Sequence, residues 1–128
     1  MPDRPRSVDH LLPLKPKVLH ILLALADGPR HGYSIMQDVA ARTDGQVRVW
    51  PAAMYGTLRE LEERDLIAEL EKRRNGDDER RRYFELTPLG KRVLNSEIRR
   101  LEAIVDQARA SRALRASTAL RAGRAGRA

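Results

Sequence analysis

The chain has 128 residues, enough for one compact domain with short tails, and it contains no cysteine, which excludes disulfides and thiolate metal sites. It has neither a signal-peptide pattern at its N-terminus nor a run of the ~18 apolar residues that a membrane span needs, so we expect a soluble, cytoplasmic protein. The net charge of +7 comes mostly from six arginines at or after Arg109, whereas residues 1–108 hold 19 basic and 18 acidic side chains, so charge alone does not make the main part of the chain a nucleic-acid binder.

The first half of the chain carries the patterns of three helices. An apolar segment that ends before Gly28 is typical of a short core helix, and apolar residues return at helical spacing after it. Pro51 then suits the first position of a third helix, in which Met54, Leu58 and Leu61 recur on one face. The predicted helices are Lys17–Ala26, Tyr33–Arg42, and Pro51 to about Asp65.

A hairpin follows the third helix. Residues 66–71 and 81–86 alternate between apolar and polar side chains, the period of two that is typical of a half-buried strand. Asn75-Gly76 between them is a strong signal for a tight hairpin turn. The sequence therefore predicts a two-stranded antiparallel sheet.

The last predicted helix runs from Pro88 to about Arg109, with Thr87 as its N-cap. Its apolar residues recur at alternating spacings of four and three, a heptad seam of about two heptads that is too short to hold a coiled coil unaided. We therefore expect the seam to pair with a second copy of the chain. The predicted dimer-interface residues are Leu94, Ile98, Leu101, Ile104, Val105 and Ala108.

Together these elements predict a mainly α fold with a small two-stranded antiparallel β-wing, that is, a winged helix-turn-helix plus a C-terminal dimerisation helix. We expect a flexible N-terminal arm over 1–16 and the winged helix-turn-helix domain over 17–87. The dimerisation helix covers 88–110, and an Arg/Ala-rich tail covers 111–128. The low complexity of the tail predicts disorder there.

Three segments resemble the PadR family of transcriptional regulators, namely HGYSIMQDVAARTDG, MYGTLRELEERDLI and RRYFELTPLGKRVL. Each motif is short, and the resemblance rests on their order and spacing over roughly residues 19–109. It implies a bacterial homodimer that binds double-stranded DNA, with the helix-turn-helix on 32–42 and 51–65, the wing on 67–86 and the dimer helix from Pro88. Gly56 and Asp65 depart from the family pattern, which commonly has a proline and a glycine at these positions.

The third helix is the recognition helix that the resemblance implies, and the N-terminal half of such a helix must approach base edges. Small side chains keep its leading face open, and Arg59 is the first long cation on that face. Tyr55, the recognition-helix tyrosine by resemblance, can either pack in the core or offer its hydroxyl to a phosphate. An ordinary solvated helix face is the alternative reading. The candidate DNA contacts on this helix are Ala52, Ala53, Tyr55, Gly56, Thr57 and Arg59.

Phosphate contacts are expected from two further places. The second helix opens with Tyr33 and Ser34, where backbone N–H groups and the serine hydroxyl suit a phosphate, although a plain helix start with Tyr33 in the core fits as well. The wing cations suit the phosphate backbone, but the acidic residues 77–79 at the wing tip could instead pair with them in a solvated hairpin. The candidate wing contacts are Arg73, Arg74, Arg80 and Arg81.

The remaining chemistry-bearing residues give weaker signals. Trp50 could lie against DNA, staple the entry to the third helix or line an effector cavity, and packing is its expected fate. His10, His20 and His31 lack metal-ligand spacing, and we expect His20 to be packed and hydrogen-bonded. We expect no enzyme activity and no cofactor, because the sequence contains no phosphate-binding glycine loop and no nucleophile motif.

The sequence thus predicts a sequence-specific regulator of transcription, a homodimer that represses from a palindromic operator. Release by a small-molecule effector stays open, since the last helix has no aromatic side chain for stacking. The alternative is a protein-interaction module that uses the same winged helix, with the basic tail as a non-specific nucleic-acid-binding arm. The nearly neutral main part of the chain keeps this alternative in play.

Overall fold

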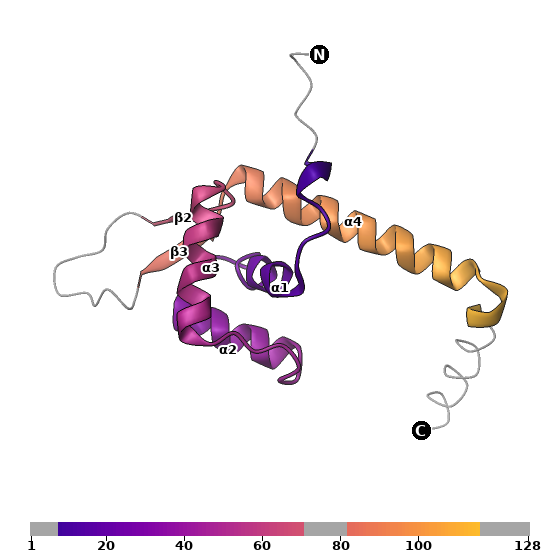
Figure 1. Cartoon of the computed structure of the whole chain (residues 1–128), viewed down its shortest axis with the longest axis horizontal. Coiled ribbons are helices and arrows are strands. Elements are labelled where there is room, and N and C mark those ends of the chain that lie inside the picture. The colour runs from indigo at the N-terminus through magenta and orange to yellow at the C-terminus, as the bar shows by residue number, and fades with distance from the viewer. Residues whose placement is uncertain (1–7, 71–81, 116–128) are drawn as a thin grey trace, which may run out of the picture. The chain divides into compact units, whose positions relative to one another are not determined.

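The structure is a computed structural model that describes residues 8–70 and 82–115. Figure 1 shows the order of its helices and strands. They are η1 (Asp9–Leu11), α1 (Pro16–Ala24), β1 (Arg30–His31), α2 (Gly32–Arg42), α3 (Pro51–Glu63), β2 (Ile67–Glu69), β3 (Tyr83–Leu86) and α4 (Pro88–Ala110). The chain divides between Asn95 and Ser96 into two units. Among the described residues, no helix is both long and apolar enough to cross a membrane.

The first three α-helices build the core of the first unit. Helix α1 begins at Pro16, whose fixed φ suits the first helical position, and α1 packs on α2, which in turn packs on α3. The apolar stripe predicted for the third helix is confirmed, because Met54, Leu58 and Leu61 are all buried. The fully buried side chains of these helices include Ile21, Leu22, Ile35, Val39, Met54 and Leu58.

The sheet has three antiparallel strands rather than the predicted two, in the order β1-β3-β2. The additional strand is the Arg30–His31 segment, where Arg30 pairs with Phe84 and His31 with Tyr83. A strand of two residues is too short to show an alternating pattern, so the sequence does not predict β1. The central strand β3 thereby connects the segment before α2 with the segment after α3.

Helix α3 ends in a Schellman motif centred on Asp65, which lies in the left-handed region with φ +62°. The N–H of Leu66 donates to the carbonyl of Leu61 at 2.9 Å, and the N–H of Asp65 donates to that of Glu62 at 2.9 Å. Aspartate tolerates this conformation better than most residues other than glycine. The family-typical glycine is therefore replaced here without loss of the turn.

The start of α4 is hydrogen-bonded to the backbone that directly follows α3. The hydroxyl of Thr87 accepts the Gly90 N–H at 2.9 Å and donates to the Asp65 carbonyl at 2.6 Å, which confirms Thr87 as the N-cap. The Thr87 N–H donates to the Leu66 carbonyl at 3.1 Å. A Cβ atom on Gly90 would lie 2.0 Å from the Leu66 carbonyl oxygen, so only glycine allows this approach.

The two ends of the described chain are more regular than the sequence predicts. Residues 1–16 are predicted as a flexible arm, yet Val8 is buried and Asp9–Leu11 form a helical turn. At the other end, residues 112–115 are helical after a bend at Ser111, where disorder is predicted. Residues 116–128 of the predicted tail lie outside the described residues.

We predict that Gly90→Ala lowers the free energy of unfolding by about 3 kcal/mol, because the new methyl group overlaps the Leu66 backbone, which cannot move aside as a side chain can. Urea denaturation measures this change. Gly56→Ala is the matched control, since nothing lies within 4 Å of its Cβ position and it sits inside α3. The control should gain about 0.5–1 kcal/mol. Equal effects of the two substitutions would contradict the packing described here.

Candidate nucleic-acid interface

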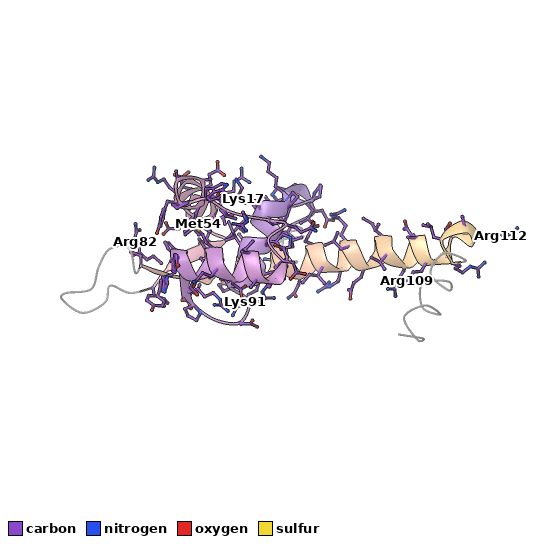
Figure 2. The ribbon with its side chains drawn as sticks, turned by 90° about the horizontal axis from the view of Figure 1, so that it is seen from below. Lys17, Met54, Arg82, Lys91, Arg109 and Arg112 are labelled. Atoms are coloured by element: carbon purple, nitrogen blue, oxygen red, sulfur yellow. The ribbon has the colours of Figure 1, made fainter. Side chains whose placement is uncertain are left out.

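The outer face of α3 is open along its first half. Ala52, Gly56 and Arg59 are exposed, while Ala53 and Thr57 are half-buried. Met54, labelled in Figure 2, faces inward and is fully buried. Ala52, Gly56 and Arg59 therefore share one exposed side of the helix, whereas Ala53 and Thr57 are only partly accessible.

Tyr55 connects this face to the start of α2. A Cβ atom on Gly32 would lie 3.1 Å from the Tyr55 hydroxyl oxygen and 3.1 Å from the ring edge, so the tyrosine lies against the first residue of α2. The ring is also partly exposed. Tyr55 thus combines both alternatives, since its ring packs against Gly32 of α2 and is still partly exposed.

The N-terminus of α2 is capped by a histidine. His31 Nδ1 accepts the backbone N–H of Ser34 at 3.2 Å, and the His31 ring meets the Tyr83 ring edge-on at a centroid distance of 5.3 Å. The Ser34 N–H is consequently used within the chain, which corrects the expectation that it is free for a phosphate. The Ser34 hydroxyl accepts a hydrogen bond from Arg30 at 3.0 Å, and its own hydrogen can still be donated. Tyr33 is exposed rather than in the core.

Arg30 holds three segments of the first unit together, a role that the sequence analysis missed. Its Nε donates to the Ala24 carbonyl at the end of α1 at 2.7 Å, Nη1 donates to Ser34, and Nη2 lies 3.4 Å from an Asp38 carboxylate oxygen. A cavity of about 350 Å³ lies beside it, with His31 and Tyr83 in its lining. The sequence does not predict this role, because a single arginine before a helix has no signature, even though its partners Ala24, Ser34 and Asp38 are near it in the chain.

Asp38 is shared between Arg30 and a second arginine. Arg42 Nε donates to Asp38 at 2.6 Å, and Arg42 Nη2 lies 2.9 Å from Asp27. The hydrogen bond to Asp38 is the main cause that raises the pKa of Arg42 above its ordinary value. Arg42 is largely exposed, so this pair contributes little to stability.

Trp50 is exposed, which contradicts its expected packing. Val49, one residue earlier, is buried, and so is Met54 in the first turn of α3. These two residues occupy the positions of a hydrophobic staple around the helix start. Val49 is therefore the residue that packs at the start of α3, the role expected of Trp50.

The described part of the wing is its base. Arg82, labelled in Figure 2, forms a two-pronged ion pair with Glu69 across the β2–β3 ladder, with its Nε 2.8 Å from Oε2. Glu69 is not one of the acidic residues 77–79 of the predicted solvated hairpin, which lie outside the described residues. The candidate contacts Arg73, Arg74, Arg80 and Arg81 lie outside the described residues.

The predicted dimer seam splits along α4. Leu94 is buried within the first unit, which corrects its assignment to the interface, because the base of α4 contributes to the protomer's own core. In the second unit, Ile98, Leu101 and Ala108 are half-buried, while Ile104 and Val105 are exposed. A groove of about 510 Å³ runs along this face, and Val105 is in its lining.

Histidine and carboxylate groups offer no metal site in the described ranges 8–70 and 82–115, where no three such side chains cluster. His31 serves as a helix cap. The Nδ1 atom of His20 is buried without a hydrogen-bond partner among the described residues, so the hydrogen bond expected for His20 is absent at that nitrogen.

A model of the "Transcriptional regulator PadR-like family" matches residues 21–96, more than half of the chain. The chain belongs to this family. The match ends at the first turns of α4 and contains α2, α3 and both sides of the wing.

Two curated relatives of this PadR-like protein each match about 60% of the chain. A 37.1 kDa uncharacterized protein in transposon Tn4556 of Streptomyces fradiae is 40% identical over 77 residues, which are 60% of this chain and 20% of that protein. An uncharacterized protein X of Lysinibacillus sphaericus is 29% identical over 79 residues, 62% of this chain and 72% of that one. The chain thus spans only a fifth of the length of the Streptomyces protein.

Solved structures agree on the winged-helix fold. A transcriptional regulator from Clostridium thermocellum has a TM-score of 0.59 at 22% identity, over 80% of this chain and 93% of that one. A PadR family transcription regulator from Clostridium difficile has a TM-score of 0.56 at 24% identity, over 73% and 97%. RosR from H. salinarum has a TM-score of 0.58 at 20% identity, over 92% and 99%. At these identities the likeness concerns the fold alone.

We predict that Arg30→Met lowers the free energy of unfolding by about 2 kcal/mol, because it leaves the Ala24 carbonyl without its partly buried donor and removes the link from Arg30 to Ser34 and Asp38. Arg42→Met is the matched control and should cost below about 0.5 kcal/mol, since it removes exposed ion pairs. Thermal and urea unfolding of both variants measure the difference. An Arg30 variant as stable as the Arg42 variant would show that Arg30 holds nothing together.

Proposed function

We propose that this PadR-like protein is a homodimeric repressor that binds a palindromic operator in double-stranded DNA, with α3 of each copy in a major groove. The open outer face of α3 carries the proposal. Ala52 and Gly56 let the helix backbone approach base edges, and Arg59 on the same face can donate to guanine O6 and N7. Membership of a family of transcriptional regulators supports DNA as the partner.

The charges along α3 favour one docking direction. The N-terminal half up to Gly56 carries no charged side chain, whereas the charged residues of the C-terminal half are all acidic apart from Arg59. Phosphates repel carboxylates, so the N-terminal end is the one that can enter the groove. The acidic residues at the other end are Glu60, Glu62, Glu63 and Asp65.

Phosphate contacts would fix the helix in that direction. The Ser34 hydroxyl keeps a hydrogen to donate, and the Tyr55 hydroxyl lies beside the same turn of α2. Neutral hydroxyl donors of this kind position a protein on the DNA backbone without reading sequence. Occupied promoter DNA would then be closed to other proteins, which is the proposed route to repression.

The apolar face of α4 supports a second copy of the chain as the dimer partner. Ile104 and Val105 are 47% and 44% exposed, and a single exposed helix face of this kind is costly to leave in water. Glu102, Asp106 and Arg109 also line the groove beside Val105, so charges of both signs border the apolar strip, as in paired helices. The effector stays a prediction from the sequence.

We predict that Arg59→Ala weakens binding to DNA from upstream of the protein's own coding region by about 10–100-fold, the loss of one good bidentate base contact. Gel-shift titration measures it. Thermal stability should not change, because Arg59 is exposed. Arg64→Ala is the matched control beyond the far end of α3 and should stay within about threefold. Equal losses in both variants would mean that charge, not the face of α3, sets the affinity.

The interaction-module alternative is tested in the full chain by changing Arg121, Arg124 and Arg127 of the tail to alanine. If the proposal holds, this variant keeps its preference for the selected sequence and loses only salt-sensitive, non-specific affinity. Loss of all DNA binding would instead assign the affinity to the tail, and it would contradict sequence recognition by α3.

We predict that Val105→Glu raises the dimer dissociation constant by roughly 100-fold, because a carboxylate would be buried in the seam of both copies. Analytical ultracentrifugation measures this change. Ala103→Glu places the same charge about 200° around the helix, on an exposed position, and should leave the dimer intact. A Val105→Glu protein that stays dimeric at the same concentrations would rule out this face of α4.

A further inference from the structure

Trp50 is the most exposed large hydrophobic side chain among the described residues, at 65%. It is the N-cap residue of α3 and makes no side-chain capping hydrogen bond. Burying a tryptophan side chain is among the largest single contributions to the free energy of folding. Trp50 makes no such contribution, and it lies at the N-terminus of the helix that the proposed function places in DNA.

The exposure does not come from a loose segment. Trp50 has extended backbone angles of φ −81° and ψ 152°, and its carbonyl accepts the Met54 N–H at 2.7 Å. Its neighbours are fixed as well, since Val49 is buried and Pro51 has a restricted φ. Successive side chains of an extended segment point to opposite sides, so a buried Val49 turns the indole outward.

The chemistry of the indole limits what it can read. It offers a broad apolar surface and a single N–H donor. The N-terminal residues of a recognition helix meet base edges in the major groove, where the one apolar group that distinguishes bases is the C5-methyl of thymine. Small neighbours at Ala52 and Ala53 leave the indole room to reach that group.

We propose that Trp50 is a specificity-determining DNA contact that packs on a thymine methyl group in each half-site. This inference rests on the proposed function and adds to it one read base and the residue that reads it. Tyr33, which is 59% exposed, lies on α2 and not at the end of the recognition helix, so the base contact is assigned to Trp50 alone.

The test begins with the duplex that the wild-type full chain selects from a randomised library. Trp50 is the only tryptophan, so its fluorescence reports on this one site. The constant for quenching by acrylamide should fall by about threefold when the selected duplex binds, since the indole then packs against a base. A scrambled duplex of equal length should give a smaller decrease. An unchanged constant with bound, selected DNA would overturn the inference.

Variants and modified DNA test the thymine contact. Trp50→Ala should weaken binding to the selected duplex by about tenfold and Trp50→Phe by less than about threefold, whereas the urea midpoint of both stays that of the wild type because the side chain is exposed. Replacing thymines one at a time by deoxyuridine removes only the methyl group. At one position per half-site, this replacement should weaken binding of the wild type by about fivefold. It should not weaken binding of Trp50→Ala any further.

The outcomes separate this inference from the proposed function. A wild-type chain that selects no duplex contradicts the proposed function itself. A chain that selects a duplex but loses nothing with deoxyuridine at any position contradicts only the thymine contact. Losses of affinity that simply add for Trp50→Ala and for deoxyuridine would also contradict only the thymine contact.

Discussion

The close approach of Gly90 to the Leu66 carbonyl is the constraint on which the arrangement of the first unit depends. At this point α3 has just ended in its left-handed turn at Asp65, β2 begins, and α4 starts under the Thr87 cap. A Cβ at position 90 would lie 2.0 Å from that oxygen, so the glycine sets how near the two backbones come. The end of α3, the start of β2 and the start of α4 are therefore joined within a few residues.

A second set of contacts links this arrangement to the face of the first unit that is proposed to bind DNA. Strand β3 pairs with β2 after α3 and with β1 before α2, so the two helices of the helix-turn-helix are fixed to the same strand. His31 and Arg30 of β1 then cap and anchor the start of α2 through Ser34. Tyr55 reaches from α3 to Gly32 at that same turn. The candidate phosphate contacts Ser34 and Tyr55 are thus held by packed helices and not by a loop.

The sequence predicts the parts that depend on local pattern and misses those that depend on distant neighbours. Helical spacing and Pro51 were enough for α3 and its buried stripe, and Thr87-Pro88 was enough for the start of α4. Which of two adjacent apolar residues is buried is a matter of tertiary packing, so Val49 and Trp50 could not be told apart. For the same reason the heptad spacing did not separate Leu94, covered by its own protomer, from the exposed Val105. The roles of Arg30 and β1 arise only when Ala24, Asp38 and Tyr83 come together.

The proposed function requires two copies of α3 to enter successive major grooves. The most direct measurement is a hydroxyl-radical footprint, combined with guanine-N7 methylation interference, of the full chain on the duplex that it selects. Two protected segments about one helical turn apart are expected, and N7 methylation should interfere with binding at guanines in the major groove that α3 occupies. Continuous protection without this period, or binding that is indifferent to methylation at N7, would contradict it.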